Sequence, residues 1–149
     1  MLLRELVDAH AAVRATSARG AKTDRLAALL RRLDPAETPA AVAFLSGEIT
    51  QRQIGVGWAA LRDLPAPAPE PSLHVAEVDA AFGRIGALAG TGSQRARREA
   101  LGGLFARATE AEQRFLVALL LGDLGQGALA GVMAEAVARA ADVPRADVR

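Results

Sequence analysis

The sequence has no cysteine, a single lysine at position 22, and only two histidines, His10 and His74. Without cysteine the chain can form no disulfide, thiol nucleophile or cysteine-ligated zinc site, and two isolated histidines are too few for a convincing metal cluster. The sequence therefore predicts no redox or metal chemistry, and no metal ligand is assigned.

Long apolar runs are also missing. No uninterrupted stretch reaches the roughly 18 residues that a membrane-spanning helix needs, and the N-terminus lacks the cationic start and apolar stretch of a secretion signal. We therefore expect a soluble, cytoplasmic protein without a membrane partner. Its 149 residues, 51% of them hydrophobic, suffice for one compact domain.

A strong excess of positive charge is absent too, because the formal net charge is +1. This near-neutrality is evidence against a strongly basic nucleic-acid binder. A prediction of DNA binding therefore depends on where the charges lie.

Aromatic residues make up 3% of the chain, and the alternating pattern of strands is absent. Instead, apolar residues recur at helical spacing almost everywhere, for example at Val75, Val78, Phe82 and Ile85. The sequence predicts an all-α fold, a single compact domain of about eight helices.

Two helix starts are marked by capping residues. Asp34, Pro35 and Glu37 offer an N-cap, a first-turn proline and a capping-box acid, and Thr109 with Glu112 offers the same arrangement without proline. We expect helices capped by Asp34 and Thr109.

The two caps lie 75 residues apart, and a shift of 75 aligns residues 3–49 with 78–124 without a gap. The match predicts two pseudo-symmetric halves, about 1–63 and 73–144. Residues 64–72 between them carry alternating prolines, which prevent helix and favour polyproline II. We interpret them as a stiff linker in preference to a proline-rich ligand for a partner domain.

One turn concentrates positive charge. Residues 89–98 combine glycines, an expected helix start and three arginines, with no acid. Free N–H groups at the positive end of a helix dipole suit a phosphate, and an ordinary turn beside a solvated basic face is the alternative. The equivalent first-half turn, residues 14–23, is also basic, and two such sites would suit the two backbones of a duplex.

A second repeated feature is a glycine-bearing turn between helices, at residues 46–58 and 121–128. Glycine allows a backbone to approach another surface closely. These turns either let helices pack tightly or let main-chain groups reach a nucleic-acid backbone, and spacing does not choose between the two.

Three single residues have plainer interpretations. Trp58 lies at helical spacing between Ile54 and Leu61, so we expect it in the core or half-buried, in preference to a base-stacking platform. His10 continues the apolar stripe of the first helix and is expected to be partly buried with its hydrogen bonds satisfied. His74, at a helix start, is expected to be exposed.

Three motifs are similar to a known family. They are Leu88-Ala89-Gly90-Thr91-Gly92-Ser93, Leu104-Phe105-Ala106-Arg107-Ala108-Thr109 and Gly122-Asp123-Leu124-Gly125-Gln126-Gly127. The last corresponds to a Gly-x-Leu-x-x-Gly turn of that family, and residues 45–58 match its first-half turn. Over nearly its whole length the chain resembles the N-terminal DNA-binding domain of ATP-dependent DNA ligases, actinobacterial members in particular.

The resemblance implies that this all-helical module helps to encircle duplex DNA for a ligase that seals nicks in replication, repair and recombination. The module would hold the minor groove and phosphate backbone of any sequence. By matching motif, the residues implied to contact one phosphate backbone are Thr91, Gly92, Ser93, Gln94, Arg95, Arg97 and Arg98. Those implied to approach the groove are Gly125, Gln126, Gly127 and Ala128. The first-half equivalents would be Thr16, Arg19 and Lys22. Family members often carry arginine at the place of Gly125. Without that charge, this turn is expected to contribute less to DNA binding than the turn around Thr91.

No catalytic residue is assigned. The ligase reaction needs a lysine in a Lys-x-Asp-Gly motif to take AMP, and Lys22-Thr23-Asp24-Arg25 has arginine in place of the glycine. The chain is therefore not expected to be an enzyme or to hold a cofactor by itself, and ATP and Mg²⁺ would belong to the catalytic domain of a parent ATP-dependent ligase.

The predicted partners are double-stranded, nicked DNA and the catalytic domain of the same ligase, and the expected state is a monomer on the bacterial nucleoid. The alternative function, favoured by the weak net charge, is a helical scaffold that binds another protein without DNA affinity.

Overall fold

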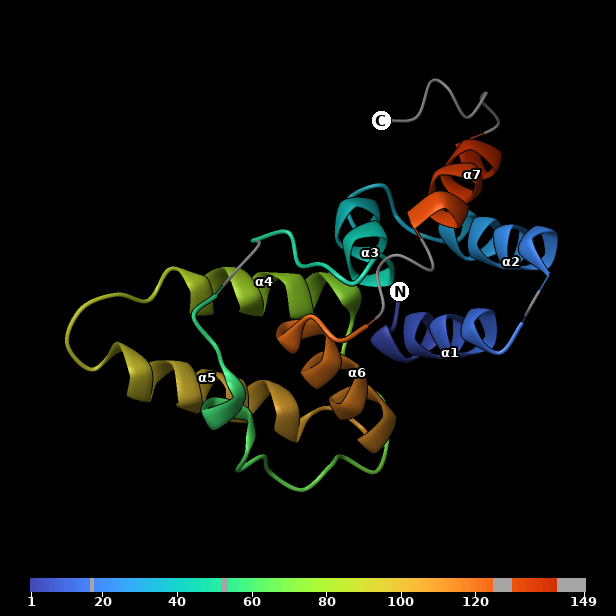
Figure 1. Ribbon diagram of the computed structural model, residues 1–149. Helices are drawn as coiled ribbons and strands as arrows, with labels where there is room; N and C mark the ends of the chain where they lie inside the picture. Colours follow the sequence, from blue (N-terminus) through green and yellow to red (C-terminus); the bar gives the residue numbers. More distant parts are fainter. Residues whose placement is uncertain (17, 52–53, 125–129, 142–149) are drawn as a thin grey trace.

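The computed structural model describes all residues except 17, 52–53, 125–129 and 142–149 (Figure 1). Within that part of the chain there are seven α-helices and one short 3₁₀ helix, and the β pairing is limited to an isolated bridge between Leu2 and His74. The helices are α1 (Leu3–Arg14), α2 (Arg19–Arg31), α3 (Thr38–Leu45), η1 (Trp58–Leu61), α4 (Val75–Gly86), α5 (Ser93–Ala106), α6 (Glu110–Leu121) and α7 (Ala130–Ala141). The all-α prediction is confirmed.

The helices are arranged on both sides of α6. Figure 1 shows α4 and α5 as a pair at one side of the molecule and α1 and α2 at the other. α1 packs against α2 and α6, α4 packs against α3 and α5, and α7 returns to pack along α2. None of the described helices is long and apolar enough to cross a membrane.

A single hydrophobic core joins the helices. Phe44, Phe82 and Phe105, from α3, α4 and α5, are fully buried, and the rings of Phe44 and Phe82 meet edge to face with centroids 6.0 Å apart. Burying one such side chain is worth about 1.5–3 kcal/mol. The core therefore holds the chain as one domain, while the division into two related halves stays a prediction.

The predicted cap at Thr109 is confirmed. The Thr109 hydroxyl accepts a hydrogen bond from the Glu112 backbone N–H (3.4 Å), and Glu112 Oε1 accepts one from the Thr109 N–H (2.8 Å). Both residues are buried, so this capping box satisfies N–H groups that solvent does not reach.

The predicted cap at Asp34 is wrong, because α3 begins at Thr38 and residues 35–37 form a turn ahead of it. Glu37 does not return to the Asp34 N–H. Its Oε1 accepts a hydrogen bond from the Met1 ammonium (2.7 Å), and its Oε2 accepts one from the Ala76 N–H in the first turn of α4 (3.2 Å). For the Glu37 carboxylate, the buried Met1 ammonium is a stronger hydrogen-bond partner than the neutral backbone amide of Asp34. Met1 is far from Glu37 in the sequence, so the local pattern did not indicate this pairing.

The prediction for Trp58 is also wrong, because its side chain is 64% exposed. Gly55 adopts a left-handed conformation (φ 71°) and Gly57 is extended, so no helix runs from Ile54 to Leu61. Only the short η1 forms, and it buries Leu61 while Trp58 faces solvent.

The histidines follow their predictions in part. His10 is buried and its ring meets Phe115 edge to face with centroids 5.3 Å apart, but its Nε2 has no hydrogen-bond partner among the described residues. Burial, and then the charge of Arg14, lower the pKa of His10. His74 is exposed at the start of α4, as predicted.

The proline-rich segment packs on the second part of the chain. Residues 62–73 contain no helix, the Ala68 N–H donates to the Ala108 carbonyl (2.8 Å), and Gln113 Nε2 donates to the Pro65 carbonyl (3.2 Å). These bonds tie the segment to the end of α5 and the start of α6.

Candidate nucleic-acid interface

The basic turn lies between α4 and α5. Gly90 and Gly92 both adopt left-handed conformations, with φ of 86° and 82°, which favour glycine. α5 begins at Ser93, and no side chain caps its N-terminus among the residues described. Thr91 and Gln94 are exposed beside this start. The first turn of α5 therefore presents a positive helix end to solvent.

The three arginines of this turn have different environments. Arg95 is strongly exposed and pairs with Glu99 one turn later (3.1 Å). Arg98 is exposed and has no hydrogen bond or ion pair within the described ranges. Of the three, Arg98 is therefore the one whose charge is left for a ligand.

Arg97 holds the turn in place. Its Nη2 donates to the Leu88 carbonyl (2.6 Å), while its buried Nε lacks a described partner. Its guanidinium also lies close to Gly55, where an added Cβ would come within 3.4 Å of Arg97 Cζ. Arg97 therefore fixes the geometry between the basic turn and the glycines of residues 55–57.

A cavity of about 220 Å³ separates α5 from η1. Its lining comes from Gln94, Arg97 and Arg98 on α5, the turn at residues 55–57, and Ala59 and Ala60 on η1. The cavity combines two guanidinium groups with exposed main chain, which is suited to an anion.

The two glycine turns of the sequence repeat meet in a larger groove. This groove, of about 790 Å³, is lined by residues 47–49, 54–57 and 119–122. Gly47 and Gly122 have φ of 83° and 76° and end α3 and α6 in the same way. The N–H of the next residue, Glu48 or Asp123, donates to a carbonyl five residues back, at 2.8 Å in both cases.

At Gly122 the left-handed turn, and not close helix packing, requires glycine. A Cβ added there would meet no atom within 4 Å. Spacing alone did not predict that residues 55–57 would join both turns in one groove. The other residues of the second turn's motif, Gly125, Gln126, Gly127 and Ala128, lie outside the described residues.

The first-half residues lie at the opposite end of the molecule, where α1 meets α2 (Figure 1). Thr16 Oγ1 donates to the Ala12 carbonyl, and Arg19 pairs with Glu135 of α7 (2.9 Å). The hydrogen bond and charge of Glu135 raise the pKa of Arg19. Lys22 is half-buried and has no ion pair in the described part of the chain. The structure therefore does not bring the two basic turns together.

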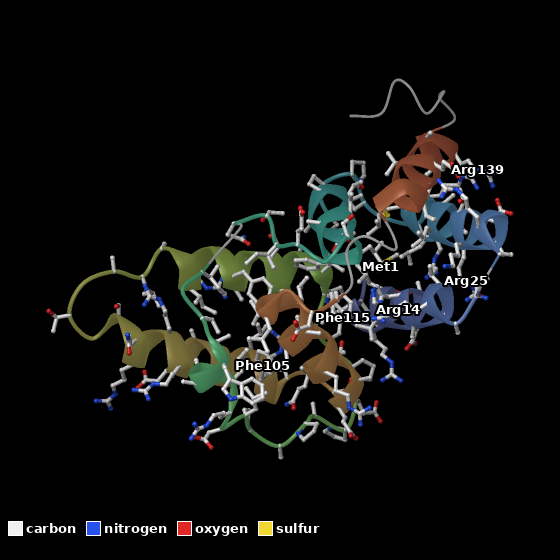
Figure 2. The ribbon with its side chains drawn as sticks, in the orientation of Figure 1. Met1, Arg14, Arg25, Phe105, Phe115 and Arg139 are labelled. Atoms are coloured by element: carbon white, nitrogen blue, oxygen red, sulfur yellow. The ribbon has the colours of Figure 1, made fainter. Side chains whose placement is uncertain are left out.

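Two further cations lie near this end and were not among the residues assigned to DNA, although Arg14 belongs to the basic turn at residues 14–23. Arg14 and Arg25 come from the neighbouring helices α1 and α2 (Figure 2), and both are exposed without an ion pair to any described residue. No local signal in the sequence distinguished them from paired arginines.

The segment Lys22-Thr23-Asp24-Arg25 lies inside α2. Thr23 is buried and donates to the Arg19 carbonyl, and Asp24 pairs with Arg139 of α7. Arg31 also donates to the Arg139 carbonyl (2.7 Å), so this face of α2 serves the contact with α7 (Figure 2). Among the described residues no group of three or more His, Asp or Glu side chains could hold a metal ion.

Comparison with known proteins shows a family match. Residues 63–138 match the family model described as DNA ligase N terminus. The chain is 58% identical over 149 residues to a probable DNA ligase of Mycolicibacterium gilvum, and 56% identical over 151 residues to a probable DNA ligase of Mycobacterium marinum. Both alignments cover the whole of this chain and 29% of the relative, so the chain spans less than a third of the length of these proteins.

Proposed function

The chain belongs to the DNA ligase N-terminal family of ATP-dependent DNA ligases, and from this we propose that it binds duplex DNA for a ligase that seals nicks. It holds the minor groove and the phosphate backbone without regard to sequence. In the cell it acts as a monomer in the cytoplasm, on the DNA of the nucleoid, together with the catalytic domain of the same ligase.

The observation that carries the proposal is the groove in which the turns at Gly47 and Gly122 meet residues 55–57. Left-handed glycines leave main-chain groups uncovered, so a nucleic-acid backbone can come close to them. Contacts of this kind read no base, which is what a protein that meets nicks in any sequence requires.

The cation for the phosphates comes from the adjacent cavity. Arg98 is unpaired among the described residues and exposed there, Gln94 offers an amide, and the N-terminus of α5 adds its dipole. Arg97 keeps the turn in position through the Leu88 carbonyl. We assign Thr91, Gly92 and Ser93 to the same phosphate contact, because they surround this helix start. Arg95 would join them by exchanging its exposed partner Glu99 for a phosphate.

The chemistry of nick sealing is assigned to the catalytic domain that a parent ligase would supply. ATP and Mg²⁺ would bind there, and this chain would hold and orient the duplex without catalysing a step.

The test compares two matched arginines. Arg98 and Arg84 are both exposed without an ion pair to a described residue, but Arg84 lies on α4 and lines a different hollow with Leu73 and Arg107. Fluorescence anisotropy of a labelled nicked duplex, titrated at several salt concentrations, would give the affinity and its salt dependence for Arg98→Ala and Arg84→Ala.

We expect Arg98→Ala to weaken binding and to reduce the slope of log K against log salt by about 1, the value for one lost phosphate contact. Arg84→Ala should leave both values near those of the unaltered chain. Equal effects of the two substitutions would contradict the proposed site, and no binding at low salt would contradict the function and favour the protein scaffold.

A further inference from the structure

Trp58 is a large apolar side chain in an unexpected place. It is the first residue of η1, it is 64% exposed, and no other large hydrophobic side chain among the described residues is exposed. A single exposed apolar residue is not unusual, so its significance depends on what surrounds it. The indole combines a large apolar face with a polar N–H group, which suits a contact that is partly apolar and partly wet.

Trp58 stands at the rim of the glycine groove. Gly57, immediately before it, lines both the groove and the basic cavity. Leu121 lines the groove and also a hollow of about 380 Å³ that includes Trp58. A ligand that fills the groove would therefore pass beside the indole ring.

The two sides of η1 have different chemistry. Ala59 and Ala60 face the cavity that contains Arg97 and Arg98. The hollow at Trp58 has apolar walls that include Val117 and Leu121.

Acids border the hollow at Trp58. Glu110 lies there paired with Arg114, and Asp123 has no ion pair within the described ranges. Arg114 also lines the hollow and balances the charge of Glu110, so Asp123 leaves the hollow slightly negative. This charge disfavours a phosphate beside the ring, whereas Arg97 and Arg98 across η1 attract one. A duplex held with its phosphates at these arginines would therefore turn an uncharged part toward Trp58.

We propose that Trp58 packs against the sugars and base edges of the minor groove of bound DNA while the start of α5 holds the phosphates. The inference rests on the proposed function and adds an apolar contact to it. Proteins of the minor groove use apolar side chains in this way, and aromatic rings contact nucleic acid without selecting a sequence.

The chain contains one tryptophan and no tyrosine, so fluorescence excited at a wavelength that only tryptophan absorbs reports on Trp58 alone. The experiment measures quenching of this emission by acrylamide, first for the chain alone and then with saturating nicked duplex, with anisotropy of the labelled duplex recorded in parallel. We expect strong quenching of the free chain and a several-fold smaller quenching constant once DNA is bound.

Two variants separate a contact from a structural role. Trp58→Ala should weaken DNA binding about tenfold, in the range found for loss of an aromatic contact to nucleic acid, without changing the salt slope. Trp58→Phe should retain most of the affinity. Circular dichroism should show unchanged helix content in both, because the side chain is mainly exposed and Leu61 supplies the buried contact of η1.

The outcomes separate this inference from the proposed function. Bound DNA with unchanged quenching of Trp58, or with unaltered affinity of Trp58→Ala, overturns the inference and leaves DNA binding standing. Quenching that falls only when the catalytic part of a related ligase is added means that a protein surface covers Trp58, and it also overturns the inference. No binding in the anisotropy titration overturns both.

Discussion

At the scale of single residues, Gly122 and Gly103 are two glycines with opposite roles. Gly122 ends α6 with φ 76°, whereas Gly103 is exposed within α5, where an added Cβ would meet no atom within 4 Å. We predict that Gly122→Ala destabilises the chain by about 1–2 kcal/mol, the cost of a side chain in left-handed backbone, and that Gly103→Ala stabilises it by about 0.5–1 kcal/mol.

Urea denaturation followed by circular dichroism measures both free energies of unfolding. The two alanines should change the free energy of unfolding in opposite directions. A destabilising effect of similar size at both positions would mean that α6 does not depend on a left-handed residue for its end.

His10 should give the chain a pH dependence near neutrality. Burial lowers the pKa of His10 in the folded state from the ordinary 6.5, so the unfolded chain takes up its proton first as the pH falls. The contribution of His10 to stability is complete above pH 6.5 and is lost as the pH falls from there through the folded pKa.

Thermal unfolding of the unaltered chain and of His10→Leu between pH 7.5 and 5.5 tests this prediction. The unaltered chain should lose more stability on acidification than the variant. Parallel profiles would show that His10 is as easily protonated in the fold as in the unfolded chain.

Local signals in the sequence were reliable for some residues and not for others. Thr109 and Glu112 bond to each other across three positions, so their spacing predicted the cap. Glu37 has the same residue type at the equivalent position, but its partners Met1 and Ala76 are more than 30 positions away, which no spacing shows. Trp58 was misplaced because left-handed Gly55 interrupts the helix that its periodicity indicated.

At the scale of elements, the α4–α5 pair presents the basic turn and is closed at its other end by Glu77 and Arg107 (2.9 Å). The bond from Arg107, followed by those from the His74 backbone and ring, lowers the pKa of Glu77 to about 2. The unfolded chain therefore binds the Glu77 proton first, and the stability from this pair is present above pH 4.5 and is lost as the pH falls to about 2.

We predict that Glu77→Gln unfolds more easily than the unaltered chain at pH 7 and that the difference shrinks as the pH falls from 4.5 to 2. Urea titrations at several pH values measure the difference. A constant difference across this range would show that the pair with Arg107 does not depend on the charge of Glu77.

The docking of α7 on α2 was not predicted. Its polar contacts join Arg19 to Glu135 and Asp24 to Arg139, more than 100 positions apart. The sequence predicted the helix starting at Ser93 and the charge on it because both are local. The sequence could not show that Glu135 of α7 would pair with Arg19, one of the residues assigned to DNA.

At the scale of the whole molecule, the Met1 ammonium connects the N-terminus to α3 and α4 through Glu37. Glu37 is 9% exposed, so this ion pair is screened from solvent. We predict that Glu37→Gln lowers the free energy of unfolding by about 1–3 kcal/mol, because a hydrogen-bonded charge loses its partner in a buried setting.

Glu99→Gln is the matched control, because Glu99 pairs with Arg95 on the open surface of α5. Its effect on the unfolding free energy should stay below about 1 kcal/mol. Equal effects of the two substitutions in urea denaturation would contradict a structural role for the ammonium.

The near-neutral net charge does not conflict with a DNA interface. Several arginines are neutralised by acids within the molecule, among them Arg19, Arg95 and Arg107, whereas Arg98 remains unpaired among the described residues beside the groove. Composition gives the sum of these charges and not their pairing. The fold class and the basic turn could therefore be predicted from the sequence, but the groove formed by residues from three separate turns could not.

The measurement that tests the account most directly is the anisotropy of labelled nicked duplexes of two unrelated sequences, titrated with this chain at increasing salt. The account predicts equal affinity for the two sequences and a steady loss of affinity as salt rises, since backbone contacts release counterions and read no base. No binding at low salt, or a strong preference for one sequence, would contradict it.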